Sequence, residues 1–323
     1  MSDREEKTGK NDNGKKNKGG KRNKIVAIEM IILVLLIMAA AAIFIQKDKS
    51  VKEAAKIHNQ KAKKTEQTPQ AVQKENEIEE ETEGTEEKNG DRDASVPDRS
   101  NFAVQPGVSV GTTEQSDEKI VYLTLDDGPS DNTQAVLDIL DKYNAKATFF
   151  VTGEMPEYKD MIKAAYDKGH TIGMHTYSHD YAKVYASVDA YFQDLDQIGQ
   201  MVQEEIGYVP CFIRFPGGSS NTVSKKYTAG IMSTLVQEVQ NRGYQYYDWN
   251  GSSGDGSVRT TEELVAQATS FDSNNIILLC HDSHGKQTTV EALPQIIEHY
   301  QSLGYTFKAL DRDSFVAHHG VNN

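Results

Sequence analysis

The chain has only two cysteines, Cys211 and Cys280, and one tryptophan among its 323 residues. So few cysteines exclude a small scaffold built on disulfide bonds. Basic residues are also in the minority, because 35 Lys and Arg stand against 48 Asp and Glu and give a net charge of −13. A nucleic-acid partner is not expected for such an acidic chain. Hydrophobic residues make up 37% of the sequence, which is low for a compact protein and indicates a polar, unfolded stretch.

One long hydrophobic run stands out against this composition. Residues 25–45 read IVAIEMIILVLLIMAAAAIFI, with Glu29 as the only charge, and are long enough to cross a bilayer as a helix. Residues 1–24 carry nine Lys and Arg against four acids, so we expect a cytoplasmic basic tail, a transmembrane anchor at 25–45 and an extracellular remainder. A cleavable signal peptide is the alternative, because the alanines at 39–42 are small, but the apolar run is long for one.

Residues 46–117 show no sustained hydrophobic periodicity, and ten acidic residues crowd positions 75–93. So few large apolar side chains cannot offset the entropy of the chain, which predicts a disordered acidic linker. A flexible tether of about 70 residues spans roughly 45–50 Å, so the following domain would range over a zone above the membrane. We expect a domain that begins near residue 115 to be active without the linker.

From residue 118 onward, short β-rich segments alternate with helical ones. The expected strands are 119–125, 147–153, 170–175, 211–215, 244–249, 274–280 and 305–310. The expected helices are 132–143, 157–168, 188–207, 222–241, 260–270 and 288–302. This alternation predicts an α/β fold with seven or eight parallel strands, as a barrel or a doubly wound sheet.

Polar residues follow five of the expected strands at their carboxyl ends. They are the pair Asp126 and Asp127, the pair His175 and His179, and single residues at Arg214, Asp248 and His281. Each pattern alone is weak, since Asp-Asp-Gly-Pro is typical of a turn and a His pair occurs on many surfaces. Because the carboxyl ends of parallel barrel strands share one face, where active sites lie, the combination favours a single site.

Five segments carry a resemblance to a known family. LTLDDGPS, HTYSH, RFPGG, DW and LCH, in this order, resemble the motifs of the polysaccharide deacetylases, the NodB-homology domain of carbohydrate esterase family 4. The resemblance covers roughly residues 118–313 and leaves residues 314–323 as a C-terminal tail that we expect to be frayed. It implies a distorted (β/α) barrel and a metal-dependent hydrolase that removes acetyl groups from polymeric sugars.

Asp127, His175 and His179 form the expected metal site. They offer one oxygen and two nitrogens, and three protein ligands leave room for water, as in catalytic zinc sites. The i, i+4 spacing of the histidines would place both imidazoles on one side of a helical turn. The resemblance assigns the metal to the same three residues. We expect one divalent ion, zinc first, with cobalt, nickel or manganese as alternatives.

The resemblance also assigns the proton-transfer roles. Asp126 corresponds to the catalytic base, and Arg214 to the arginine that keeps this carboxylate ionised. His281 corresponds to the catalytic acid that protonates the departing amine. Asp248 corresponds to the aspartate that orients this histidine and raises its pKa.

Three further residues are expected to contact the substrate. The backbone N–H of Gly217 would hold the oxyanion, Leu279 would line the acetyl-methyl pocket and Trp249 would form a wall of the groove. Two positions depart from the family. Many members carry an aromatic residue where this chain has Gly217, and an aspartate where it has Gln245.

The expected location points to a substrate. An enzyme held on the cell membrane by one N-terminal helix, with its catalytic domain outside, meets peptidoglycan first, so N-acetylglucosamine in this cell-wall polysaccharide is favoured. Poly-N-acetylglucosamine, N-acetylmuramic acid and O-acetylated xylan are alternatives. A catalytically inactive glycan-binding module is an alternative of another class, but its sign would be a missing base, ligand or acid. We expect a monomer.

The two cysteines lie next to site residues in the sequence. Because side chains alternate along a strand, Cys280 and Cys211 would point away from His281 and Arg214, under the helices. Their strands are separated by the strand that carries Asp248, which is too far for a disulfide. Two buried free thiols are therefore expected.

Overall fold

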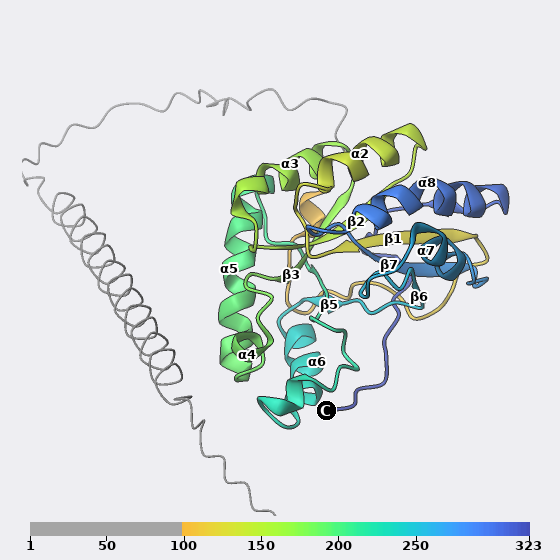
Figure 1. Ribbon diagram of the computed structural model, residues 1–323. Coiled ribbons are helices and arrows are strands. Elements are labelled where there is room, and N and C mark those ends of the chain that lie inside the picture. The colour runs from red at the N-terminus through yellow and green to blue at the C-terminus, as the bar shows by residue number, and fades with distance from the viewer. Residues whose placement is uncertain (1–98) are drawn as a thin grey trace, which may run out of the picture. The chain divides into compact units, whose positions relative to one another are not determined.

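The computed structural model describes residues 99–323. Its strands form one parallel sheet. They are β1 (Ile120–Asp126), β2 (Ala147–Thr152), β3 (Thr171–Thr176), β4 (Phe212–Ile213), β5 (Gln245–Tyr246), β6 (Gly251–Ser252), β7 (Asn275–His281) and β8 (Thr306–Phe307). Their order is β5-β4-β3-β2-β1-β7-β6, and β8 pairs with β1 off this path. The sheet is a parallel half-barrel, consistent with a (β/α) barrel, and β5 and β6 are its two ends (Figure 1).

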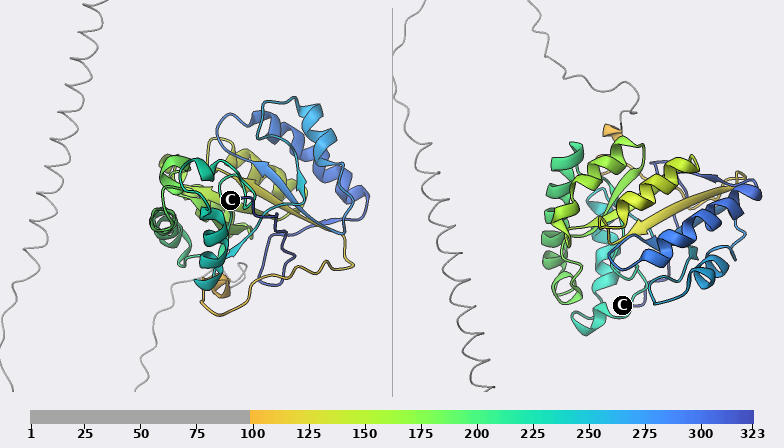
Figure 2. Two further views of the ribbon diagram at one scale, coloured as in Figure 1. Left: turned by 90° about the horizontal axis from the view of Figure 1, so that it is seen from below. Right: turned by 45° about the horizontal axis from the view of Figure 1, so that its top comes forward.

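Seven α-helices connect the strands of the described part. They are α2 (Thr133–Lys142), α3 (Asp160–Asp167), α4 (Tyr181–Val184), α5 (Val188–Ile206), α6 (Ile231–Asn241), α7 (Thr261–Ala268) and α8 (Gln287–Ser302). Helices α5 and α8 lie far apart along the sheet (Figure 2), and both contribute side chains to the same larger apolar cluster. The apolar stripe predicted for α5 is confirmed, because Leu195, Ile198 and Val202 are fully buried.

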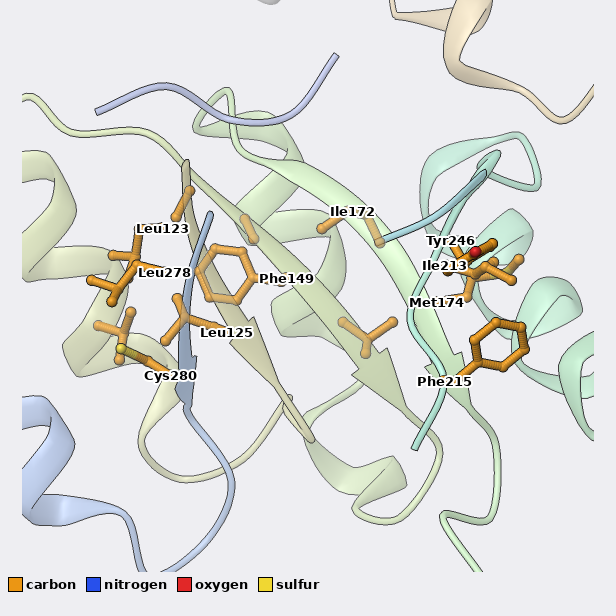
Figure 3. Packing of buried hydrophobic residues seen from close by; sticks show 14 of the residues in the cluster. Leu123, Leu125, Phe149, Ile172, Met174, Ile213, Phe215, Tyr246, Leu278 and Cys280 are labelled. Carbon is orange, nitrogen blue, oxygen red and sulfur yellow. The ribbon is translucent and has the colours of Figure 1, made fainter. Parts of the chain in front are cut away.

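Alternation along the strands creates two apolar clusters. On β1, Val121, Leu123 and Leu125 pack in the larger cluster beneath the helices. Leu125 lies beside Cys280 of β7, its partner in the strand register (Figure 3). Tyr122 belongs to the smaller cluster on the opposite strand face. Burying each Leu or Val side chain contributes about 1.5–3 kcal/mol. Asp126 lies on the strand face opposite the helices, and its side chain accepts a hydrogen bond from Arg214 there.

The predicted strands are all present, with ends shifted by a few residues. The sequence did not predict β6, because two residues within a Gly- and Ser-rich stretch carry no strand signal. The helix predicted at 222–241 is wrong in its first half. Gly230 adopts φ +77, a left-handed conformation that an α-helix excludes, and α6 begins only at Ile231.

The described end of the predicted linker is not disordered. Residues 99–117 pack on the half-barrel, with Phe102 edge-on to Phe212 at 5.2 Å between ring centroids. Arg99 is buried, donates hydrogen bonds to the backbone oxygens of Tyr166 and His170, and lies over the Tyr166 ring. The linker prediction failed here because a few anchoring side chains, and no periodic pattern, hold the segment in place.

The expected frayed tail at 314–323 is also wrong. Val316 and Ala317 belong to the smaller apolar cluster, and the backbone N–H of His319 donates to Asp248 Oδ2 at 2.8 Å. The terminal Asn323 bonds to Ser233 in α6 through its backbone oxygen. The tail is therefore part of the folded domain.

Three of the segments expected from the sequence lie before residue 99. The basic tail at 1–24, the anchor at 25–45 and positions 46–98 of the linker lie outside the described residues. Among residues 99–323, no helix combines the length and the apolar character that a membrane span requires.

Both cysteines are buried free thiols, as predicted. Cys280 packs beneath the helices, as its place in β7 implies. Cys211 does not, because it precedes β4 and lies in the smaller cluster. Its backbone N–H donates to the backbone oxygen of Phe102 in the N-terminal segment. Cys211 is therefore outside the strand, and the alternation of side chains along a strand does not predict its direction.

Candidate active site

Polar groups from distant parts of the chain meet at one edge of the sheet. β1 ends at Asp126 and β7 ends at His281, and these two residues are paired in the strand register. His175 lies near the carboxyl end of β3, two strands away in the same parallel sheet. Arg214 follows β4 and reaches Asp126. The predicted gathering of these side chains is thus confirmed.

Asp127, His175 and His179 form a compact cluster. The Oδ1 atom of Asp127 lies 3.4 Å from His175 Nε2 and 3.3 Å from His179 Nε2. All three potential ligand atoms lie within 4.8 Å of one another. Oδ1 of Asp127 is buried and has no hydrogen-bond partner among the described residues. One carboxylate and two imidazoles with such an unpaired oxygen fit a divalent cation.

The histidine pair is not on a helical turn, contrary to the spacing argument. His175 belongs to β3, while His179 lies in the loop before α4 with φ +45. Asp127 also has a positive φ, of 67. Such conformations cost of order 1–3 kcal/mol outside glycine and persist only where the surroundings hold them. Both unusual backbones therefore coincide with candidate metal ligands.

Hydrogen bonds orient the His175 imidazole and hold the loop that precedes His179. His175 donates its Nδ1–H to the backbone oxygen of Arg214 at 2.6 Å, which leaves the Nε2 lone pair facing Asp127. The loop before His179 is held by Asp194 of α5, which accepts hydrogen bonds from the Tyr177 N–H and the Ser178 hydroxyl, each at 2.5 Å.

Asp194 is a functional residue that belongs to none of the five motifs. A signal was present, because an acidic residue three positions after Tyr191 falls on the apolar face of a helix. A carboxylate at such a position needs hydrogen-bond donors, and here they come from the loop that carries His179.

The electrostatic environment of Asp127 favours its ionised form. Burial raises the pKa of this carboxyl, but His175, His179 and His281 outweigh it, and the net pKa lies below the usual value. Burial lowers the pKa of His175, so its neutral, ligating form is favoured. An ionised carboxylate and a neutral imidazole are the forms in which Asp127 and His175 can bind a cation.

Asp126 and Arg214 form a buried ion pair, as the resemblance implies. Arg214 Nη1 lies 2.7 Å from Asp126 Oδ1, and the arginine side chain is fully buried. Three further N–H groups of this guanidinium donate to Thr124 Oγ1 and to the backbone oxygens of Tyr247 and Asp248. A guanidinium fixed in this way holds its carboxylate partner in one place.

The partner of His281 is Asp255 and not Asp248, which corrects the sequence analysis. His281 Nδ1 lies 2.8 Å from Asp255 Oδ1, and the backbone N–H of His281 donates to Oδ2 at the same distance. Thr289 donates to Oδ2 as well. Burial alone would lower the pKa of His281, but Asp255 outweighs it and raises this pKa to about 9. His281 is therefore held protonated.

Asp248 and Asp255 both follow short strands, so their sequence contexts are alike. Asp255 lies in the run Gly-Ser-Ser-Gly-Asp-Gly, which carries no strand signal, and the pairing of β6 with β7 brings it beside His281. A second aspartate six residues after Trp249 is the signal in the sequence that could have identified it.

Asp248 has a different task, because it fastens a loop. Its Oδ1 accepts the backbone N–H of Ser219, and its Oδ2 accepts the Ser219 hydroxyl and the backbone N–H of His319. It is buried and joins the loop at 216–221 to the C-terminal segment. Since that loop carries Gly217, Asp248 positions the expected oxyanion donor.

The three expected substrate contacts lie around this group. Leu279 precedes His281 by two residues on the same face of β7 and is 7% exposed. Trp249 lies with its ring 5.7 Å from the Arg214 guanidinium and edge-on to His319. Gly217 is exposed and has φ +75.

Known proteins resemble this chain over the described domain. The family model for polysaccharide deacetylase matches residues 113–236. The catalytic domain of a peptidoglycan N-acetylglucosamine deacetylase from Eubacterium rectale is 47% identical, with a TM-score of 0.63, and the match covers 65% of this chain and 97% of that one. A peptidoglycan-N-acetylglucosamine deacetylase of Bacillus cereus is 29% identical over 65% of this chain and 78% of its own. A chitin deacetylase of Arthroderma benhamiae is 36% identical over 54% of this chain and 46% of its own.

A carboxylate fixed by arginine, a protonated imidazole fixed by carboxylate and a cluster of potential metal ligands are the equipment of a hydrolase, which is the class that fold and site define. Within this class, the chain belongs to the polysaccharide deacetylase family. It is a deacetylase, and the family assignment made from the five motifs is confirmed.

Proposed function

We propose that this chain is a metal-dependent deacetylase of extracellular peptidoglycan that releases acetate from N-acetylglucosamine residues. The observation that carries the proposal is the meeting of three units at one strand edge: Asp126 with Arg214, His281 with Asp255, and the cluster around Asp127. Amide hydrolysis needs a base, an acid and stabilisation of the oxyanion, and each unit supplies one of these.

Asp127, His175 and His179 are the residues that would hold the metal, with zinc as the first choice. When bound, a divalent ion supplies Lewis-acid polarisation and lowers the pKa of water. The proposed site lies at the mouth of a distorted (β/α) barrel with a gap between β5 and β6.

The protein residues account for the proton transfers. The Asp126 carboxylate takes a proton from the attacking water, and Arg214 keeps this carboxylate in place. His281 gives its proton to the departing amine as the carbon–nitrogen bond breaks, and Asp255 stabilises the protonated imidazole until then. The N–H of Gly217 donates to the acetyl oxygen as negative charge develops there.

The proposed location supports peptidoglycan as the substrate. Residues 25–45 would anchor the chain in the cell membrane with residues 1–24 in the cytoplasm, and the domain would act outside as a monomer. Relatives named as peptidoglycan N-acetylglucosamine deacetylases add to this support. No base, ligand or acid is missing, which disfavours an inactive glycan-binding module.

Acetate release tests the function directly. The full chain, loaded with zinc, should release acetate from chitooligosaccharides and from peptidoglycan fragments, and a chelator should abolish the release. Mass analysis of the wall fragments should show that N-acetylglucosamine has lost its acetyl group. Loss of the acetyl group from N-acetylmuramic acid, or activity only on poly-N-acetylglucosamine or acetylated xylan, would identify that sugar or polymer as the substrate instead. No release from any of these with zinc, cobalt, nickel or manganese would refute the proposal.

A further inference from the structure

Tyr181 lies beside the candidate active site and has no role in the proposed mechanism. It is the first residue of α4, two positions after His179, and its ring meets the His179 ring edge-on at 5.8 Å between centroids. The side chain is half-buried. Among residues 99–323, the Tyr181 hydroxyl has no hydrogen-bond partner. A phenol with this unused donor borders the cluster of potential metal ligands.

The hydroxyl of Tyr181 also adjoins Gly217. A Cβ atom placed on Gly217 would lie only 2.7 Å from Tyr181 Oη and 3.6 Å from Tyr181 Cε1. The tyrosine thus occupies the space into which a side chain at position 217 would project. Since Gly217 carries the N–H that is expected to hold the oxyanion, the hydroxyl lies next to that donor.

Tyr185, one helical turn further on, shows what a purely structural tyrosine does here. Its side chain is fully buried, and its hydroxyl donates to the backbone oxygen of Pro216 at 2.8 Å. The two rings contact each other edge-on at 5.6 Å. Tyr185 therefore fastens the loop that carries Gly217, while the hydroxyl of Tyr181 remains available to a ligand.

We propose that Tyr181 is a further catalytic residue, whose hydroxyl donates a hydrogen bond to the oxygen of the reacting acetyl group beside the N–H of Gly217. This inference rests on the proposed deacetylase function. At neutral pH a phenol is protonated and can only strengthen such a bond as charge develops on the oxygen. The Tyr181 ring would also form the groove wall that an aromatic residue at position 217 forms in many family members and that Gly217 cannot form.

Tyr181→Phe removes the hydroxyl and keeps the ring. In the full chain loaded with zinc, we expect kcat on chitooligosaccharides to fall about tenfold or more, with KM changed less than twofold, because the bond matters most in the transition state. Zinc content and Tm should equal those of the wild type. The matched control is Tyr185→Phe, which leaves the Pro216 oxygen unpaired and should lower Tm.

Binding of acetate gives a second readout that needs no turnover. Acetate should bind zinc-loaded Tyr181→Phe several-fold more weakly than the wild type, as measured by calorimetry. If the wild type releases no acetate from any polymer but this difference in affinity persists, the proposed function fails and the role of Tyr181 toward an acetyl oxygen stands. If the variant matches the wild type in kcat and in acetate affinity, or if the wild type neither turns over nor binds acetate, the inference is overturned.

Discussion

Asp126 and Asp127 are neighbours in the chain, yet their carboxylates meet different surroundings. The Asp126 carboxylate accepts a hydrogen bond from a fully buried guanidinium, whereas Oδ1 of Asp127 faces two imidazole nitrogens and no donor. The left-handed backbone at Asp127 contributes to this, since φ is 67 at the residue that follows β1. One carboxylate is thereby equipped as a base and the other as a ligand.

Substitutions should separate these two roles. We expect Asp126→Asn to retain bound zinc and to lose about 10²- to 10⁴-fold in kcat, because only the base is removed. His179→Ala should lose both zinc and activity, since it removes one of three ligands. Elemental analysis of the purified variants together with acetate release provides the measurement. A metal-free Asp126→Asn beside a metal-bound Asp127→Asn would mean that the roles are reversed.

His170 links the stability of the domain to pH. Its side chain is fully buried, and burial first, then the nearby Lys146, lower its pKa to about 3, below the ordinary value of 6.5. Between these two values the unfolded chain binds a proton that the folded protein does not. The free energy of unfolding should therefore fall as the pH decreases from 6.5 toward 3, by about 1.4 kcal/mol per pH unit from this group.

His170→Asn should flatten that dependence. The asparagine can still accept the hydrogen bond that the Ala147 N–H donates to His170 Nδ1, but it does not titrate. Urea unfolding of both proteins between pH 8 and pH 4 measures the effect, and the pH 8 values give the difference that is independent of protonation. Parallel slopes for the two proteins would exclude His170 as the source.

At the scale of elements, the loops that follow the short strands determine which partners Asp248 and Asp255 bind. β5 ends before Asp248 and β6 ends before Asp255, and these two short strands are the two ends of the sheet. The pairing of β6 with β7 turns Asp255 toward His281, whereas Asp248 turns toward the loop at 216–221. Two similar strand ends thus serve the acid and the oxyanion donor separately.

Asp255→Asn and Asp248→Asn should differ in their consequences. Asp255→Asn removes the charge that keeps His281 protonated, so we expect kcat to fall about 10²-fold or more at neutral pH, with little change in Tm. Asp248→Asn disturbs the bonds to Ser219 and His319 and should lower Tm by several degrees, with a smaller loss of activity. Steady-state kinetics and thermal unfolding of both variants check this, and the opposite ranking would restore Asp248 as the partner of the acid.

At the scale of the whole molecule, both terminal segments complete the half-barrel. Phe102 and Val110 from the N-terminal side and Phe315 and Val316 from the C-terminal side join one apolar cluster with residues of the strands. The folded unit therefore begins earlier in the chain than a linker at 46–117 implies, and it includes the final residues.

Two truncations should distinguish the tether from the folded part. A chain that begins at Arg99 keeps every contact described for residues 99–117, so its Tm and its activity on soluble chitooligosaccharides should match those of the full chain. A chain that begins at residue 118 loses the buried Phe102 and Val110 and should lose several kcal/mol of stability. Equal Tm values for the two truncations would show that the N-terminal segment contributes nothing to the fold.

The sequence alone determined the local features of this protein. Strands and helices follow from periodicity, and the acidic, basic and imidazole groups fall at the ends of strands because each pattern is written in neighbouring residues. For the same reason Asp126, Asp127, Arg214 and His281 could be found without coordinates, and the five motifs identified the family.

Only the tertiary structure decided which groups touch across long separations. The bond from His281 to Asp255 spans 26 positions, and the bond from His319 to Asp248 spans 71. The place of Tyr181 beside Gly217 likewise depends on the path of two loops. Loop paths and terminal segments are fixed by packing and by a few hydrogen bonds that leave no periodic trace in the sequence, so the partners of the catalytic acid and of the oxyanion loop had to be seen in three dimensions.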